Sequence, residues 1–170
     1  MIPLVEAIKR YSAVMAICRV MIIGAPGSGK TWLARRLAQQ LQLPVYSVDD
    51  AVWDENGKLR EADEIDRLVR AVVFKDCWVI EGGNSRTYQD RANRAELVIR
   101  MAPPWWLRVF RILMRDGIRL NLVRTTIQYD AIFGDKDSAA LAGASKSANT
   151  IEIRNRRDAA RVIEYYKNQK

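Results

Sequence analysis

The chain has 170 residues, of which 49% are hydrophobic and 28% are charged, and its formal net charge is +8 at pH 7. This length and balance are typical of one globular domain that is large enough to bury a core. The sequence contains no histidine, which excludes imidazole acid–base catalysis and histidine metal ligation.

The net positive charge indicates which partners the protein could bind, and the two cysteines indicate the redox environment in which it works. A positive charge fits a nucleic-acid partner, but an enzyme that binds several phosphates also gathers arginines. No basic stripe interleaved with aromatic residues marks a DNA or RNA surface, so DNA stays a possible partner without a motif of its own. Cys18 and Cys77 lack the spacing of a metal site or a disulfide framework, and we interpret them as core thiols in a reducing cytoplasm.

Residues 1–17 precede the first predicted strand and form an N-terminal extension, either a short amphipathic helix or an added leader. The apolar stretch 12–25 suggests a signal or membrane segment. Arg19 interrupts that stretch, however, and a glycine-rich loop occupies its end. We therefore expect no membrane segment, a cytoplasmic protein, and a single domain over residues 18–170.

The strongest motif of the chain follows the apolar run at residues 18–23, which predicts a buried parallel strand. The next eight residues read G-A-P-G-S-G-K-T and match the phosphate-loop pattern G-x-x-x-x-G-K-[ST]. Apolar residues at helical spacing over 31–41 predict a helix after the loop. We expect this strand, loop and helix to bind ATP through Gly24, Ala25, Pro26, Gly27, Ser28, Gly29, Lys30, Thr31 and Trp32.

Each part of the motif suits a bound triphosphate. Gly24, Gly27 and Gly29 let the backbone turn so that its N–H groups converge on the phosphates, and the positive end of the helix adds to them. Lys30 would place an ammonium group on the outer phosphates, and the Thr31 hydroxyl would bind Mg²⁺.

A short strand is predicted within residues 43–50, and it ends in Asp49 and Asp50. Ligands bind beyond the carboxyl ends of the strands in an open α/β sheet, so these acids lie where a substrate would. A helix N-cap with a loop acid is the equally supported alternative. The segment 61–75 then has helical spacing.

The third predicted strand, 78–81, ends in Glu81 followed by Gly82 and Gly83. An acid at this place can hold Mg²⁺ through water, and the glycines allow a ligand to approach the backbone. A further strand is predicted over 97–101. A helix over 105–115 follows it and presents Arg111 and Arg115 on one face, either for an anion or as a solvated surface.

The segment 116–150 is the least regular part of the sequence. Residues 134–138 and 142–145 read as loops, so the segment is interpreted as a mobile lid or a plain surface loop. Helical spacing returns over 152–167, with Arg154 and Arg157 on one face. Strands that alternate with helices predict an α/β fold, a three-layer sandwich around a parallel sheet.

The chain from about Arg19 to Arg157 resembles the adenylate-kinase-like group of small phosphate-loop proteins labelled DNA topology modulation proteins. The likeness rests on V-M-I-I-G-A-P-G-S-G-K-T, L-P-V-Y-S-V-D-D, W-V-I-E-G-G-N-S-R-T and A-E-L-V-I-R-M-A-P-P-W-W-L. The chain departs from the family's usual aspartates at Glu81 and Ala102 and in its lid composition. The family's final strand is expected to be missing, because the chain stops at Lys170.

The resemblance implies a nucleoside-monophosphate-kinase-like fold with sheet order 2-3-1-4. It implies an acceptor site formed by Asp49, Gly82, Gly83 and Arg86, and a lid entered through Arg111 and Arg115 and closed by Arg154 or Arg157.

The residues favour an ATP- and Mg²⁺-dependent kinase that phosphorylates a nucleoside monophosphate or a related small acceptor. Phosphoryl transfer needs positioning and charge neutralisation, so the absence of histidine is no obstacle. Lys30, Arg111 and Arg115 would act on the phosphates, and Asp49 would be the base for a hydroxyl acceptor, which leaves a shikimate-kinase-like reaction open. The alternative is a nucleotide-binding regulator of DNA or a protein partner with little turnover. A monomer or a homodimer fits either function.

Overall fold

A computed structural model describes residues 17–144 and 148–168 of the chain. Its centre is a five-stranded sheet in the order β2-β3-β1-β4-β5, and every neighbouring pair of strands is parallel. In chain order the strands are β1 (Arg19–Gly24), β2 (Val45–Ser47), β3 (Trp78–Glu81), β4 (Leu97–Met101) and β5 (Asn149–Ile153).

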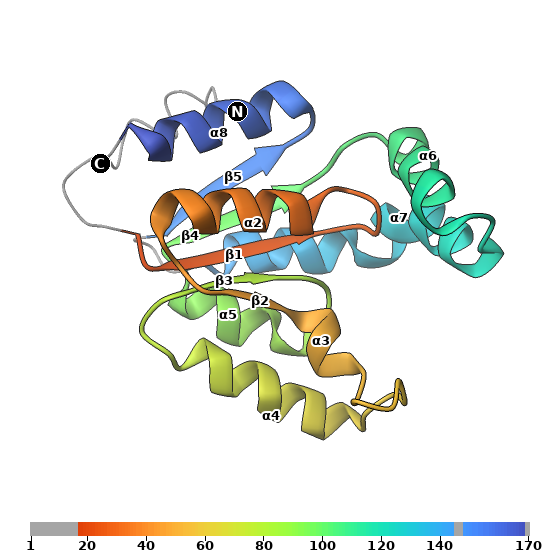
Figure 1. Cartoon of the computed structure of the whole chain (residues 1–170), viewed down its shortest axis with the longest axis horizontal. Helices are drawn as coiled ribbons and strands as arrows, with labels where there is room; N and C mark the ends of the chain where they lie inside the picture. The colour runs from red at the N-terminus through yellow and green to blue at the C-terminus, as the bar shows by residue number, and fades with distance from the viewer. Residues whose placement is uncertain (1–16, 145–147, 169–170) are drawn as a thin grey trace.

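Helices cover both faces of the sheet and make the three-layer sandwich that the sequence predicts (Figure 1). They are α2 (Lys30–Leu41), α3 (Val48–Val52), α4 (Ala62–Val73), α5 (Tyr88–Arg94), α6 (Trp105–Asp116), α7 (Leu120–Ala142) and α8 (Arg156–Lys167), with a 3₁₀ turn η1 (Ser85–Thr87). The predicted helices 31–41, 61–75 and 105–115 are confirmed as α2, α4 and α6, whereas the short α5 carries no pattern by which the sequence predicts it.

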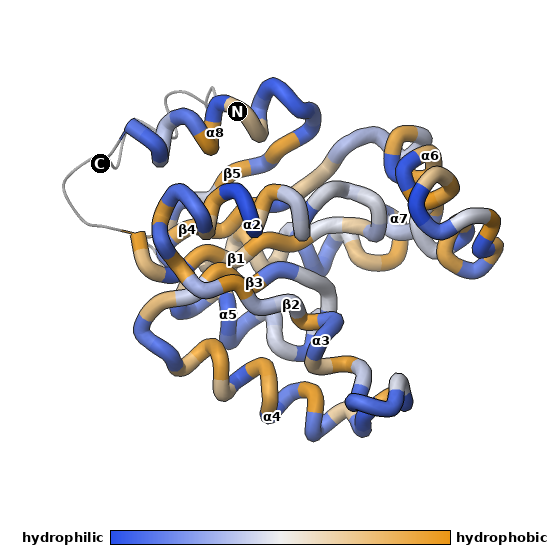
Figure 2. The backbone as a smooth tube through the Cα atoms, in the orientation of Figure 1, coloured by the Kyte–Doolittle hydropathy of each residue, from blue (hydrophilic) through white to orange (hydrophobic). Residues whose placement is uncertain are grey.

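The apolar core has two parts, because side chains along each strand point alternately to the two faces of the sheet. Val20 and Ile22 of β1 face α2 and α8, whereas Met21 and Ile23 face α4, α5 and α7. Colouring by hydropathy shows hydrophobic residues along β1 and hydrophilic ones along the outer sides of α2 and α8 (Figure 2). The central strand is therefore buried on both faces, as expected for a parallel sheet.

The strand order confirms 2-3-1-4 and corrects the expectation that the final strand is missing. β5 pairs with β4 over its whole length, from Leu97 opposite Asn149 to Met101 opposite Ile153. Ile151 and Ile153 are buried while Thr150 is exposed, which is the period-two pattern of a strand. The predicted helix 152–167 therefore begins only at Arg156, where Asn155 caps it by accepting the Asp158 N–H at 3.0 Å.

The interpretation of residues 134–138 as a loop is also wrong. They lie inside the 23-residue helix α7, and Gly134 does not interrupt it. The carboxyl-terminal half of α7 packs against the core, where Asp137 and Ala140 are buried. Tertiary packing here outweighs the weak helix propensity of Gly, Asp and Ser.

Two further predictions concern the N-terminal extension and a membrane segment. The N-terminal extension lies outside the described residues apart from its last residue, Ile17. Among the described helices, none is both long enough and apolar enough to cross a bilayer.

Candidate active site

The phosphate loop joins β1 to α2 in a conformation that only glycine accommodates easily. Gly24 has φ +135°, and a Cβ atom there would lie 2.3 Å from the Met101 carbonyl oxygen. Gly27 has φ +71° and packs equally closely against the backbone of Arg108 on α6. The glycines therefore allow the left-handed turns and let β4 and α6 approach the loop backbone.

The loop presents polar groups that have no hydrogen-bond partner in the described part of the chain. Among the described residues, no hydrogen bond occupies the N–H groups of Gly27 and Gly29, both of which have a positive φ. The Ser28 hydroxyl is fully buried and has no partner within the described part of the chain. The Ser28 N–H between them donates to the Ala25 carbonyl oxygen at 3.2 Å. Free N–H groups in a loop at a helix N-terminus favour anion binding, so the loop fits a phosphate.

Lys30 lies at the start of α2, and its Nζ donates a 3.0 Å hydrogen bond to the Ala25 carbonyl oxygen across the loop. Burial lowers the pKa of Lys30, while the negative charges of Glu81, Asp49 and Asp137 oppose that shift. A partly buried ammonium near the loop is a group that an anionic phosphate would stabilise.

Oxygen atoms meet beside the loop at the carboxyl ends of β2 and β3. Glu81 is 2% exposed, and its Oε1 accepts hydrogen bonds from the Thr31 hydroxyl at 2.9 Å and from the Ser47 hydroxyl at 3.1 Å. A carboxylate and two hydroxyls are oxygen ligands of the kind that Mg²⁺ prefers. The predicted pair Thr31 and Glu81 is therefore adjacent, and Ser47, which no motif in the sequence marks, joins it.

Of the two arginines predicted on one face of α6, only Arg111 reaches the loop. Its Nη1 donates to the Ser28 carbonyl oxygen at 3.0 Å, and burial together with the charge of Arg156 lowers its pKa. Arg115 instead pairs with Asp116 at 2.7 Å and is 67% exposed at its side chain. Its pKa is raised mainly by that pairing and to a smaller extent by Asp49.

The predicted acceptor residues border the same end of the sheet but differ in exposure and in the contacts that they already make. Asp49 is exposed in the first turn of α3, and Gly83 has open space where a side chain would be. Gly82 has φ +121° and packs against Val48. Arg86 is engaged by two carboxylates, Asp66 at 2.8 Å and Asp63 at 2.7 Å. These two carboxylates of α4 therefore hold the Arg86 guanidinium against that helix.

A cavity of about 380 Å³ opens beside the phosphate loop. Ser28, Gly29 and Trp32 form its wall on the loop side, and Met101 and Pro103 contribute apolar surface. Arg111, Arg154 and Arg156 supply its positive charge. Apolar walls beside a phosphate site suit the base and ribose of a nucleotide. Arg154 thus lies at the cavity, whereas the other predicted lid arginine, Arg157, is exposed on α8 and does not line it.

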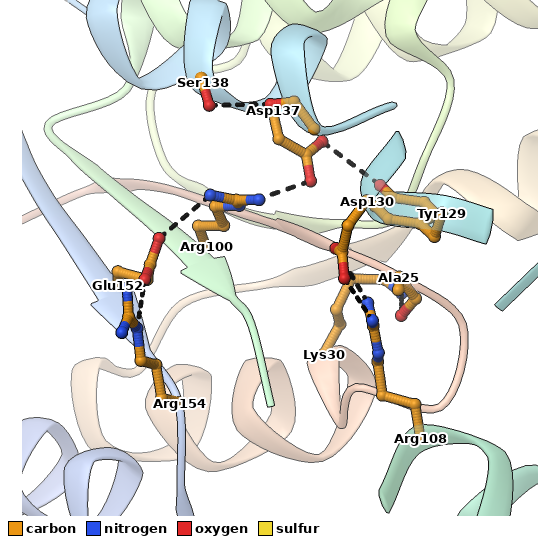
Figure 3. Close-up of polar contacts among 11 residues, drawn as sticks. Ala25, Lys30, Arg100, Arg108, Tyr129, Asp130, Asp137, Ser138, Glu152 and Arg154 are labelled. Atoms are coloured by element: carbon orange, nitrogen blue, oxygen red, sulfur yellow. Dashed lines mark hydrogen bonds and ion pairs between the residues drawn. The ribbon is translucent and has the colours of Figure 1, made fainter. Parts of the chain in front are cut away.

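A chain of ion pairs fixes Arg154 at this cavity (Figure 3). Arg154 Nε donates to Glu152 at 2.6 Å, and Glu152 accepts from Arg100 of β4 at 3.1 Å. On its other side Arg100 lies 3.7 Å from Asp137, which is fully buried and accepts from the Tyr129 hydroxyl at 3.3 Å. Burial raises the pKa of Asp137, and Arg100 opposes this shift. The chain connects α7, β4 and β5 to the cavity wall.

A buried arginine that the sequence did not reveal supports the glycine turn after β3. Arg91 of α5 is fully buried, and it donates to the carbonyl oxygens of Gly82 at 3.1 Å, Gly83 at 2.6 Å and Asn84 at 3.0 Å. Burial lowers its pKa to about 10, so Arg91 stays charged at neutral pH. Arg91 thus holds the Gly82–Gly83 turn, which the sequence predicts to border an acceptor.

Replacement of Arg91 by methionine should lower the free energy of unfolding by about 3 kcal/mol, because it leaves several buried carbonyls without donors. Urea denaturation followed by circular dichroism measures this change. Arg94→Met on the same helix is the matched control, since the Arg94 side chain stacks on the exposed Phe74 ring, and it should cost less than about 1 kcal/mol. Equal losses in the two variants would contradict the role given to Arg91.

Comparison with known proteins agrees with this architecture. Shikimate kinase from Acinetobacter baumannii superposes with a TM-score of 0.63 over 92% of this chain and 93% of that one, at 14% identity. A gluconokinase from Sinorhizobium meliloti superposes with a TM-score of 0.56 over 92% and 93%, at 13% identity. The chain has the P-loop kinase fold.

Comparison of the sequence gives two partial matches. Cytidylate kinase from Aeropyrum pernix is 34% identical over 116 residues, which span 59% of this chain and 66% of that protein. The alignment thus covers just under two thirds of the relative. The family model described as "ATPase family associated with various cellular activities (AAA)" matches residues 20–92, less than half of the chain, from β1 into α5. The residues matched by the family model include the phosphate loop.

Proposed function

We propose that the protein is an ATP-dependent kinase that phosphorylates a small molecule. The observation that carries the proposal is the phosphate loop. Its Gly27 and Gly29 N–H groups and its buried Ser28 hydroxyl have no partner within residues 17–144 and 148–168, and the Lys30 ammonium lies across it. The adjoining cavity offers a place for the nucleoside, and the exposed Asp49 and the Gly82–Gly83 turn lie at the same edge of the sheet.

The residues of the site would have two tasks in the reaction: they would bind ATP and neutralise the charge on its phosphates. Lys30 and the loop amides would hold the outer phosphates of ATP, and Arg111 would balance the charge that develops on the transferred group. The bond from the γ-phosphorus to the bridging oxygen of ADP breaks as a bond to the acceptor oxygen forms. An acceptor hydroxyl would lose its proton to Asp49, whereas a phosphate acceptor needs no base.

Thr31 and Glu81 would hold Mg²⁺ beside the loop, with Glu81 acting through water and Ser47 supporting it. When bound, the ion would neutralise charge on the β- and γ-phosphates. No group of three or more acidic or cysteine side chains suited to a metal occurs in the described residues. Mg²⁺ with few protein ligands is common in kinases, because phosphates and water complete its coordination.

The preferred acceptor is a nucleoside monophosphate or a related small phosphate compound, which the similarity to a cytidylate kinase supports. The pairing of Arg86 with Asp63 and Asp66 favours the second possibility, a hydroxyl acceptor with Asp49 as base, because it occupies an arginine that would otherwise bind the acceptor phosphate. Membership of the DNA topology modulation group stays a prediction, as do a cytoplasmic location and a monomeric or homodimeric state.

A lid is proposed only for the connection between α6 and α7. Ile118 and Leu120 there are 82% and 75% exposed, and Arg111 and Arg115 lie on the helix that leads into it. The rest of the predicted lid, 116–150, includes the packed half of α7 and the start of β5. Movement is therefore expected at this connection and not over the whole segment.

The function is tested by incubating the protein with ATP, Mg²⁺ and a panel of nucleoside monophosphates, nucleosides and small hydroxy acids. ADP release that depends on one acceptor, with a phosphorylated product of matching mass, is the expected result. Nucleotide binding without transfer to any member of the panel would favour the regulatory alternative.

Glu152→Gln should raise the KM for ATP about three- to tenfold and change kcat by less than about twofold, because it weakens the charged contact that holds Arg154 at the cavity. Steady-state kinetics at saturating acceptor measure both constants. Glu164→Gln, on the exposed side of α8, is the control and should change neither. A fall in kcat at unchanged KM would contradict a role in nucleotide positioning.

A further inference from the structure

The only two cysteines of the sequence lie at the amino ends of two neighbouring strands, β1 and β3. Arg19 of β1 is opposite Trp78 of β3 in the parallel register, so Cys18 and Cys77 each directly precede a paired residue. The Trp78 N–H donates to the Cys18 carbonyl oxygen at 2.7 Å, and the Cys18 N–H donates to Glu96 at 2.7 Å. These bonds fix the backbone of Cys18 against both neighbouring strands.

The two side chains belong to the same face of the sheet. Val20 and Val79, each two residues further along its strand, both pack in the core beneath α2 and α8. Side chains two residues apart on a strand share a face, so the two thiols project from adjacent strands to one side. Neighbouring strands lie about 4.8 Å apart, within the range of about 4.4–6.8 Å over which disulfides join two Cα atoms.

The surroundings of Cys18 disfavour its thiolate. The neighbouring Cys77 side chain, together with burial, raises the pKa of Cys18 to about 11. Cys18 is therefore a poor first nucleophile, and Cys77, which follows the exposed residues Lys75 and Asp76, is the thiol expected to react first. Both cysteines are partly exposed, so a small reagent can reach them.

We propose that Cys18 and Cys77 form an oxidisable dithiol that low-molecular-weight disulfides convert reversibly into an intramolecular disulfide between β1 and β3. The Cys77 thiolate attacks a glutathione disulfide, forms a mixed disulfide and releases one glutathione thiolate. The Cys18 thiol then loses its proton and attacks the Cys77 sulfur, which releases the second glutathione. Two protein thiols are thereby oxidised, and one glutathione disulfide is reduced to two thiols.

The site lies at the amino ends of the strands, whereas the phosphate loop follows the carboxyl end of β1. The bond would close the chain segment from 18 to 77, which contains the loop, α2, β2, α3 and α4. The proposal does not depend on the proposed kinase activity, and its test needs no substrate.

The test is incubation of the reduced full-length protein with glutathione disulfide, followed by denaturation, thiol labelling and intact-mass measurement. The expected product is a monomer that has lost both thiols and about 2 Da, the mass of two hydrogen atoms, and that regains them on reduction. Two labelled thiols after prolonged incubation, persistent glutathione adducts or cross-linked dimers alone would overturn the proposal.

Single substitutions test the order of attack. Cys18→Ser removes the resolving thiol, so Cys77 should accumulate as a stable glutathione adduct. Cys77→Ser removes the partner thiol, so Cys18 should form a glutathione adduct but no disulfide. In the wild-type protein, where Cys77 holds the pKa of Cys18 high, brief thiol labelling followed by peptide mapping should find the adduct on Cys77 first. An adduct that forms faster on Cys18 than on Cys77 would overturn the assignment of Cys77 as the attacking thiol.

Discussion

Lys30→Ala should lower kcat/KM for phosphoryl transfer by about a thousandfold, which is about 4 kcal/mol of transition-state stabilisation. The Lys30 ammonium is held across the loop by the Ala25 carbonyl oxygen, and it is the cation that begins α2 at the predicted phosphate position. No other lysine of the described residues touches the loop, so no side chain of the same type can replace it.

The fold of this variant should persist. Lys30 makes one hydrogen bond, and burial disfavours its charge, so its removal should change the free energy of unfolding by no more than about 1 kcal/mol. Lys75→Ala is the control, since Lys75 lies on the surface against Tyr46 and should retain full activity. Transfer at the wild-type rate by a folded Lys30→Ala protein would refute the proposed arrangement of ATP.

Glu81→Gln should lower kcat by about a hundredfold or more and raise the Mg²⁺ concentration needed for half-maximal activity. Glutamine has nearly the same shape, and its amide oxygen can still accept from Thr31 and Ser47, so stability should change little. Glutamine lacks the negative charge that would hold the ion. The variant therefore tests metal binding while leaving the packing of the side chain unchanged.

The rate measured as a function of Mg²⁺ concentration gives the change in the concentration needed for half-maximal activity. Glu61→Gln, which changes an exposed carboxylate at the start of α4, should leave the titration unchanged. Identical magnesium dependence in wild type and Glu81→Gln would exclude Glu81 from the metal site.

Features of the fold that depend on local pattern could be predicted from the sequence. The apolar runs at β1, β3 and β4 and the phosphate-loop motif follow from residue type and spacing alone, and the structure has all of them. β5 and α7 could not be placed in the same way. Alternation over five residues is too short to separate a strand from a helix, and the Gly134 region forms a helix only because Asp137 and Ala140 pack against the sheet.

Contacts between distant segments explain the remaining differences at the site. Arg86 looks available in the sequence, but α4 brings Asp63 and Asp66 to it. Arg115 turns to the neighbouring Asp116, and Arg91 becomes buried beneath the Gly82–Gly83 turn. The pairing of Cys18 with Cys77 depends on the register of β1 and β3, which no spacing in the sequence encodes.

The central claim is that the loop between β1 and α2 binds the polyphosphate of a nucleotide. Calorimetric titration of MgATP into the wild-type protein tests it most directly, with Lys30→Ala titrated in parallel. We predict saturable 1:1 binding with a Kd below about 1 mM, weakened at least about tenfold in the variant. Absence of any saturable heat at millimolar MgATP, or equal affinity in the two proteins, would contradict the account.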